Sequence, residues 1–393
     1  MRTARSRGPA FLTRREFVGA LGGIGSYALS TGSKLSAQTV PAKPLRSADG
    51  TFFSAPPAEF DPIMGYRWLR GPIRLLRVMN GELITDSTCS GNNYGYNCSY
   101  DFTPKKPSRR TYRLVVLGDS FTAGLNMPLS WPQRLQQLLR SRPDRWHEVQ
   151  VYPFAIDGGG LVNWYSVFVN QILPEFEFDG LIIASWYEDL GRKWIVLNAD
   201  STGMYILTCD YNNRPQSREA FEAARPRMRK LYNMSSNDEI AQMVDRISQK
   251  SEPTPLNAEY YCKEWTGESE LAPPGYVFST DVFVKRYGTE PLTMFTRIVD
   301  ECRKCSVPII FCSVPTRQGL LRAKRAEGSL LHRAESEGLS RRFGLQYFDA
   351  YGVFEDIDAR SIVDLYWLKY DAHWGQTASD LFALKLAELI ART

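Results

Sequence analysis

The chain has 393 residues, of which 43% are hydrophobic and 23% are charged. This composition excludes a mostly disordered or collagen-like chain and is sufficient for a hydrophobic core of normal size. The formal net charge is +5, but residues 1–37 carry six basic residues and one acidic residue, so the remainder is formally neutral. The basic balance is therefore no argument for nucleic-acid binding, and no nucleic-acid partner is expected.

The first segment, residues 1–37, has the pattern of an export signal. Paired arginines at 14 and 15 are followed by Phe17, then by an apolar, glycine-rich run over 18–29 and by small residues. This order resembles a twin-arginine (Tat) signal peptide and predicts a periplasmic or secreted protein. The run is shorter than the ~20 residues that span a bilayer, so no stable membrane span is expected after signal removal. An uncleaved membrane anchor is the alternative interpretation.

The next segment, residues 38–110, is expected to contain a linker and a small irregular or β-rich subdomain, because it is rich in turn-forming residues. From residue 111 to 393 apolar strands alternate with helical patterns, except for a polar insertion at about 191–280. Continuous apolar strands that alternate with helices indicate an α/β fold with a parallel sheet covered on both faces. Strands are expected at 113–117, 149–155, 180–185, 307–314 and 345–350. Helices are expected at 131–140, 163–173 and 377–391, over most of 283–305 and 318–343, and within the insertion at 216–233 and 236–249.

Seven cysteines are consistent with an exported protein. Cys89 and Cys98 flank a polar loop and could close it with a disulfide, and Cys209 and Cys262 are a second possible pair. The alternative for all of them is burial as small apolar residues. The odd count leaves at least one thiol unpaired within the chain.

A serine follows the first strand of the predicted sheet, in Gly118-Asp119-Ser120-Phe121-Thr122-Ala123-Gly124. Parallel sheets bind their ligands at this carboxyl edge. The glycines at both ends allow tight turns and close approach of a substrate. The Gly-x-Ser-x-Gly elbow of ordinary α/β-hydrolases is absent, because position 122 is Thr. Ser120 is the predicted nucleophile.

A serine nucleophile needs a base, and the chain offers His147, His332 and His373. His147 lies in a polar connection and His332 on a charged helix, so both are expected at the surface. His373 follows the last predicted strand and has Asp371 two residues before it. That loop shares the sheet edge of Ser120, and Asp371 can orient the imidazole and stabilise its charged form.

Gly118-Asp119-Ser120-Phe121-x-x-Gly124 together with Asp371-x-His373 resembles the SGNH (GDSL-type) hydrolase superfamily. The upstream Asp61-Pro62-x-x-Gly65-Tyr66 is similar to the branch found in exopolysaccharide and cell-envelope gene products. The resemblance covers roughly 60–190 and 280–393. It implies a three-layer α/β/α fold with a mostly parallel, doubly wound, flavodoxin-like sheet, and acyl transfer by a Ser-His-Asp triad.

The resemblance also implies an oxyanion hole made by the Ser120 N–H, a glycine N–H after the second strand and an asparagine after the third. Gly158 matches the glycine, with Gly159 as the alternative. At the asparagine position this chain has Glu188, and an ionised carboxylate donates no hydrogen bond. Either Glu188 is protonated, or another donor such as Asn163 substitutes, or the activity is weak or altered.

The function that the resemblance implies is an exported serine esterase acting on O-acyl groups, acetyl foremost, of a polysaccharide or another small ester. One alternative is a polysaccharide O-acetyltransferase with the same triad. In alginate O-acetyltransferase-like proteins Asp-x-His precedes the serine, so the chain order here favours the hydrolase. A second alternative is a non-catalytic polysaccharide-binding or assembly protein, which Glu188 would suit. No Walker loop or His-rich metal motif occurs, and Cys302-x-x-Cys305 lacks a second ligand pair, so no cofactor or metal is expected.

Overall fold

A computed structural model describes residues 50–55, 58–79, 82–124, 127–142, 146–187, 189–192, 194–200, 203–208, 232–234, 236–248, 271–324, 328–359, 361–366 and 373–392. The expected signal segment, residues 1–37, lies outside the described residues. Ser47–Thr393 form one compact unit. In the described part of the chain, no helix is both long and apolar enough to cross a membrane.

The central feature is a five-stranded sheet in which every neighbouring pair is parallel. Its strands are β6 (Thr111–Gly118), β7 (Glu148–Ala155), β8 (Gly180–Ser185), β12 (Ile309–Ser313) and β13 (Gln346–Asp349), in the order β13-β12-β8-β6-β7. This is the flavodoxin-like order, in which the strand order reverses between β6 and β8. The predicted α/β fold with a doubly wound parallel sheet is therefore confirmed.

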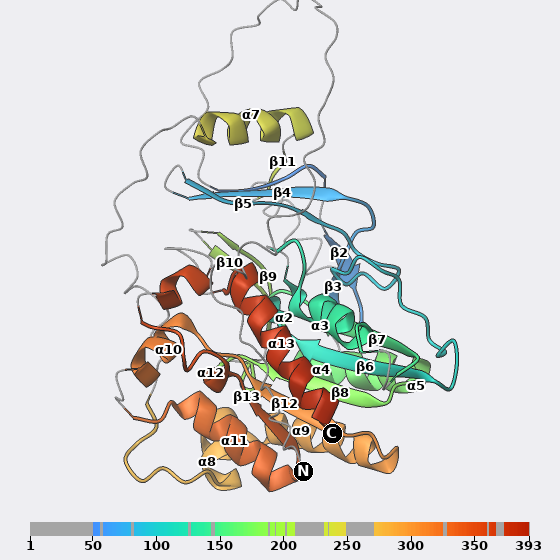
Figure 1. Ribbon diagram of the computed structural model, residues 1–393, viewed down its shortest axis with the longest axis vertical. Helices are drawn as coiled ribbons and strands as arrows, with labels where there is room; N and C mark the ends of the chain where they lie inside the picture. Colours follow the sequence, from blue (N-terminus) through green and yellow to red (C-terminus); the bar gives the residue numbers. More distant parts are fainter. Residues whose placement is uncertain are drawn as a thin grey trace, which may run out of the picture. The chain divides into compact units, whose positions relative to one another are not determined.

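Helices cover both faces of this sheet. Val115 and Leu117 of β6 belong to one hydrophobic cluster, whereas Leu114 and Val116 belong to another. The first cluster includes side chains of α4 (Leu161–Val167), α9 (Thr289–Lys304) and α11 (Leu331–Phe343), and the second those of α3 (Trp131–Arg140) and α13 (Gln376–Arg392). Figure 1 shows α13, in red, running beside α3. Burial on both faces explains why the strands are continuously apolar in sequence.

Local signals set the helix limits. A capping box of Ser130 and Gln133 starts α3, which matches the predicted 131–140. The region 283–305, predicted to be mostly helical, contains two helices, α8 (Thr280–Tyr287) and α9. They are separated at Gly288, because its φ of 95° is incompatible with a helix. The remaining helical elements are α2 (Ser120–Ala123), a π-helical turn (Phe168–Ile172), α5 (Leu173–Glu175), α10 (Arg317–Lys324), α12 (Ala350–Val353) and a 3₁₀ turn (Ser361–Leu365).

The region before the main sheet is β-rich, as predicted. It contains β1 (Gly50–Phe53), β4 (Ile73–Met79), β5 (Glu82–Cys89) and the hairpin of β2 (Ala58–Asp61) and β3 (Gly65–Trp68). Tyr66, Trp68 and Phe102 join the same hydrophobic cluster as Val115 and Leu117 of β6. This region therefore shares a core with the main sheet.

The insertion, for which only helices and turns were predicted, also contains strands. α7 (Asn237–Ser248) confirms the helix expected at 236–249. The helix expected at 216–233 falls mostly outside the described residues. Its predicted last two residues, 232 and 233, instead belong to a strand, β11 (Tyr232–Met234), which pairs in parallel with β1. β9 (Trp194–Asp200) and β10 (Gly203–Thr208) form a hairpin that was not predicted. Pairing with strands distant in sequence overrides local helical propensity at β11.

The disulfide considered between Cys89 and Cys98 is not formed, since both are buried free thiols. The Cys89 Sγ lies 3.5 Å from the Ile73 carbonyl oxygen. Burial raises the pKa of each thiol to about 12, so both behave as small apolar side chains. Cys209 and Cys262 lie outside the described residues.

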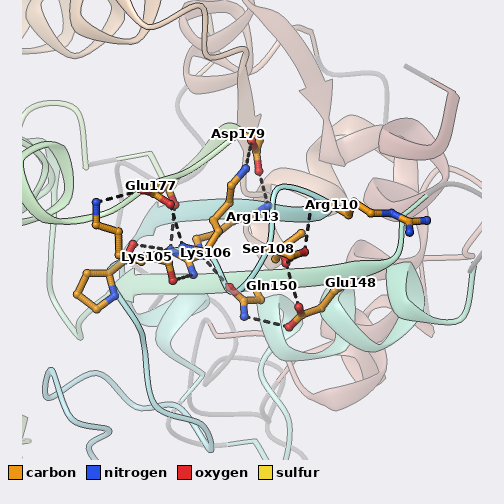
Figure 2. A network of polar contacts seen from close by, with 11 residues as sticks. Lys105, Lys106, Ser108, Arg110, Arg113, Glu148, Gln150, Glu177 and Asp179 are labelled. Atoms are coloured by element: carbon orange, nitrogen blue, oxygen red, sulfur yellow. Dashed lines mark hydrogen bonds and ion pairs between the residues drawn. The ribbon is translucent and has the colours of Figure 1, made fainter.

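A polar network closes the amino edge of the sheet, around the fully buried Arg113 on β6 (Figure 2). Its Nε donates to the Gln150 Oε1 at 2.8 Å. Its two Nη atoms donate to the carbonyl oxygens of Pro104, Lys105 and Glu177 at 2.8, 2.9 and 3.0 Å. The guanidinium thus fixes the chain before β6 to the starts of β7 and β8.

Candidate active site

Ser120 stands at the sharp turn between β6 and the short helix α2. Asp119 caps that helix, with its Oδ1 accepting from the Phe121 N–H at 3.0 Å. Gly124 ends the helix in the left-handed region, at φ 59°. A Cβ at Gly118 would lie 2.1 Å from the Thr122 Oγ1, so only glycine fits there. The turn presents Ser120 at the carboxyl edge of the sheet, beside the point where the strand order reverses.

The structure brings His373 to Ser120, although they are 253 residues apart in sequence. The His373 Nε2 lies 2.6 Å from the Ser120 Oγ. The imidazole stacks on the Phe121 ring at 4.7 Å between centroids, and the neighbouring Trp374 Nε1 donates to the Phe121 carbonyl at 3.3 Å. A serine hydroxyl against an imidazole nitrogen is the arrangement that activates a serine nucleophile.

One carboxylate among the described residues contacts this pair. Asp371, the predicted orienting residue, lies outside the described residues. Asp119 is buried, and its Oδ2 accepts from the Ser120 Oγ at a long 3.5 Å. Burial raises the pKa of Asp119, and the charges of Arg192 and His373 oppose that shift. Asp119 was part of the sequence motif, but nothing in the sequence gave it an electrostatic partner.

The loop after β7 contains the predicted oxyanion donors. The Gly159 N–H donates to the Ile156 carbonyl at 3.1 Å, and Gly158 has a φ of 71°. These features define a tight turn with Gly158 at its third position. Because the Gly159 N–H closes the turn, Gly158 is the better placed of the two candidates. Within the described residues, neither the Gly158 nor the Ser120 N–H has a hydrogen-bond acceptor.

The remaining oxyanion candidates have different positions. Glu188 lies outside the described residues. Asn163 is buried near the start of α4, where its Oδ1 accepts from the Gly160 N–H at 3.3 Å and its Nδ2 donates to the Met64 carbonyl at 3.2 Å. Its amide therefore joins the loop to the β2–β3 hairpin.

Arg192 supports the glycine loop and was not anticipated from the sequence. Its Nη1 donates to the Gly159 carbonyl at 3.0 Å and lies 3.4 Å from the Asp189 Oδ1. The Asp189 Oδ2 in turn accepts from the Trp186 N–H at 2.7 Å. The Arg192 charge also acts on Asp119, so this one guanidinium connects the loops that follow β6, β7 and β8.

The two other histidines do not join the site, and one of them differs from expectation. His147 is exposed, as predicted. His332 was expected at the surface and is instead buried. Charged neighbours do not place this side of the helix at the surface, since Glu335 on the same helix is also buried and accepts from the Tyr287 hydroxyl at 2.7 Å. Burial lowers the pKa of His332 to about 3.

This burial predicts an acid-sensitive fold. The folded-state pKa of His332, about 3, lies below the ordinary histidine value of 6.5, so the unfolded chain binds more protons between these pH values. The free energy of unfolding should therefore fall as pH drops below 6.5, by about 2 kcal/mol at pH 5. Urea unfolding from pH 4.5 to 7.5 should show a shallower slope for His332→Gln than for wild type. His147→Gln is the exposed control, and an equal slope in wild type and His332→Gln would contradict the prediction.

The described residues contain no group of three or more His, Cys, Asp or Glu side chains that could hold a metal ion. No family model matches the chain, and no curated protein matches it. Solved structures do resemble it. The lipase Lip_vut3 from a goat rumen metagenome aligns at 12% identity and a TM-score of 0.36, covering 70% of this chain and 96% of that one.

Two further solved structures have similar values. A variant of Axe2, an acetyl-xylooligosaccharide esterase from Geobacillus Stearmophilus, aligns at 11% identity and a TM-score of 0.36, covering 70% of this chain and 93% of that one. The lipase/acylhydrolase from Enterococcus faecalis aligns at 11% identity and a TM-score of 0.32, covering 71% and 95%. At these identities and TM-scores, the function of this chain has to be argued from its own side chains.

Proposed function

We propose that the protein is an exported serine esterase of the SGNH type. The observation that carries the proposal is the 2.6 Å contact between the Ser120 Oγ and the His373 Nε2. The contact joins the two motifs of the sequence resemblance at the carboxyl edge of a parallel sheet. Asp119 and Phe121 hold the nucleophile turn and the imidazole in place.

The chemistry follows from these positions. The Ser120 Oγ attacks the ester carbonyl carbon while His373 takes its proton. The negative charge that develops on the carbonyl oxygen is stabilised by the N–H groups of Ser120 and Gly158. Collapse of this intermediate releases the alcohol, which receives the proton from His373 and leaves an acyl-enzyme. Water then attacks in the same way and releases the acid. In this proposal Asp371 orients His373.

The proposed substrate is an O-acyl, foremost O-acetyl, group on a polysaccharide, and the proposed compartment is the periplasm or the exterior. The substrate rests on the resemblance of Asp61-Pro62-x-x-Gly65-Tyr66 to the cell-envelope branch, and the compartment on the twin-arginine pattern of residues 1–37. Hydrolysis is preferred over transfer to a sugar hydroxyl because the serine motif precedes Asp371-x-His373.

Covalent labelling with a fluorophosphonate probe tests the activated serine. We expect wild type to be labelled between pH 6 and 9, and both Ser120→Ala and His373→Ala to lose labelling. Ser141→Ala and His147→Ala are the controls, since both side chains are exposed and lie outside the site. Labelling that persists in Ser120→Ala would overturn Ser120 as the nucleophile. A folded wild-type protein that is never labelled would overturn the proposal and favour a binding protein. Acetate release from acetylated oligosaccharides, with and without an acceptor sugar, then separates hydrolysis from transfer.

A further inference from the structure

The peptide between Asp157 and Gly158 is held from outside the catalytic sheet. The hydroxyl of Tyr66, on β3 of the N-terminal hairpin, donates to the Asp157 carbonyl oxygen at 2.9 Å. We propose that Tyr66 is a positioning residue, which aims the Gly158 N–H at the oxygen of the reacting ester. This inference rests on the proposed esterase function.

The argument begins with the planarity of the peptide bond. The Asp157 carbonyl and the Gly158 N–H belong to one trans peptide unit, so they point in opposite directions within one plane. A hydrogen bond that fixes the carbonyl oxygen therefore also fixes the direction of the N–H.

The turn itself leaves this plane weakly defined. Its closing hydrogen bond joins the Gly159 N–H to the Ile156 carbonyl and does not involve the middle peptide. Gly158 has a φ of 71°, and Asp157 is not among the described residues with positive φ, which makes this a type II turn. Type I and type II turns differ in the orientation of the middle peptide, and glycine at the third position is compatible with both. An external donor to the Asp157 carbonyl selects one orientation.

Tyr66 is well placed to make that selection, because its side chain is buried and the turn before it is closed by hydrogen bonds. Its side chain is 1% exposed and packs edge-on against Trp68, with ring centroids 5.8 Å apart. Before it, the Asp61 Oδ1 accepts from the N–H groups of Ile63 and Met64 at 2.8 and 2.9 Å, and Gly65 turns the chain with a φ of 95°.

The same hairpin is fastened to the helix that follows the oxyanion loop. The Ile63 carbonyl accepts from the Ser166 Oγ at 2.6 Å, and the Met64 carbonyl accepts from the Asn163 Nδ2 at 3.2 Å. Both donors lie on α4, which begins at Leu161. The Asp61-Pro62-x-x-Gly65-Tyr66 motif thus has a structural role next to the site. It brings a buried hydroxyl to the peptide whose N–H is the proposed oxyanion donor.

The test is Tyr66→Phe, which removes only the hydroxyl. The Gly158 N–H remains but loses its fixed direction, so the loss should be smaller than the roughly 10²–10³-fold that follows deletion of an oxyanion donor. We expect kcat for acetyl-ester hydrolysis to fall about 10- to 100-fold with KM nearly unchanged, because the N–H acts on charge that develops in the transition state. Affinity for a trifluoromethyl ketone, which forms a tetrahedral adduct with the serine, should fall by the same factor.

Tyr96→Phe is the matched control. Tyr96 is equally buried in the same hydrophobic cluster, and its hydroxyl donates to the Gln171 Oε1 at 2.7 Å, away from the loop. It should lower the melting temperature to a similar extent while leaving kcat and ketone affinity at wild-type values.

Three outcomes would overturn the inference: an unchanged kcat in Tyr66→Phe, a rise in KM alone, or an equal kcat loss in Tyr96→Phe. Ser120→Ala, measured in the same assay, separates this inference from the proposed function. If Ser120→Ala still hydrolyses the ester at the wild-type rate, both the proposed function and this inference are wrong. If Ser120→Ala is inactive and Tyr66→Phe is fully active, the proposed function stands and only the role of Tyr66 is wrong.

Discussion

Ser120→Ala and His373→Ala are each expected to lower kcat for acetyl-ester hydrolysis by about 10⁴-fold or more, and the double variant should be no worse than either. The reason is the 2.6 Å contact between the Ser120 Oγ and the His373 Nε2, through which one proton moves in a single step. Without the base the hydroxyl is a weak nucleophile, and without the hydroxyl the base has no proton to take. Each variant therefore removes the same interaction.

The measurement is a double-mutant cycle on acetate release, with circular dichroism to show that all the variants are folded. His147→Ala serves as a histidine control, because its side chain is exposed. Losses that multiply in the double variant would show two independent contributions and would contradict a Ser120–His373 unit. A His373→Ala enzyme within about tenfold of wild type would identify a different base.

The sheet could be predicted from the sequence because its strands are buried on both faces and hence continuously apolar. β8 was predicted to the residue, and β6 and β7 nearly so. Helix α3 was predicted from the helical spacing of Leu135, Leu138 and Leu139, and the structure buries Leu135 and Leu139 on one face of it. The β9–β10 hairpin and β11 could not be predicted in this way. β11 is three residues long and exists through pairing with β1, about 180 residues away.

The same distinction holds at the site. Ser120 and His373 were found because each lies in a short motif that follows a strand. Tyr66 donates to the Asp157 carbonyl and Arg192 to the Gly159 carbonyl. Because these acceptors are backbone atoms, no pattern of residue types in the sequence indicates either contact. His332 was misplaced for a related reason, since its charged neighbours on α11 gave no sign that its own side of the helix is buried.

The two edges of the sheet carry different polar chemistry. At the carboxyl edge Ser120 and His373 are half-buried, as a site that admits substrate requires. At the amino edge Arg113 is fully buried, and its donors are directed at protein acceptors (Figure 2). Arg113 lies near the start of β6 and Ser120 follows its end, so the two residues are at opposite edges of the sheet. A substitution at Arg113 should therefore change stability with little effect on the chemistry at Ser120.

Arg113→Met is accordingly expected to lower the free energy of unfolding by about 3–5 kcal/mol, the range for removing one partner of a buried charged network. Methionine fills a similar volume but donates nothing to the carbonyls of Pro104 and Lys105 or to the Gln150 side chain. Burial lowers the pKa of Arg113, and the charges of neighbouring acidic groups oppose that shift. Removing the cation therefore leaves those acidic groups with less compensation as well.

Guanidinium unfolding followed by fluorescence gives the measurement, with Arg110→Met as the control. Arg110 is exposed and lies next to the same network, so its replacement should cost less than about 0.5 kcal/mol. The folded fraction of Arg113→Met should keep the fluorophosphonate labelling rate of wild type, because its lost contacts lie at the amino edge. A cost below about 1 kcal/mol would show that water replaces the lost donors and that the network is not needed to hold the edge closed.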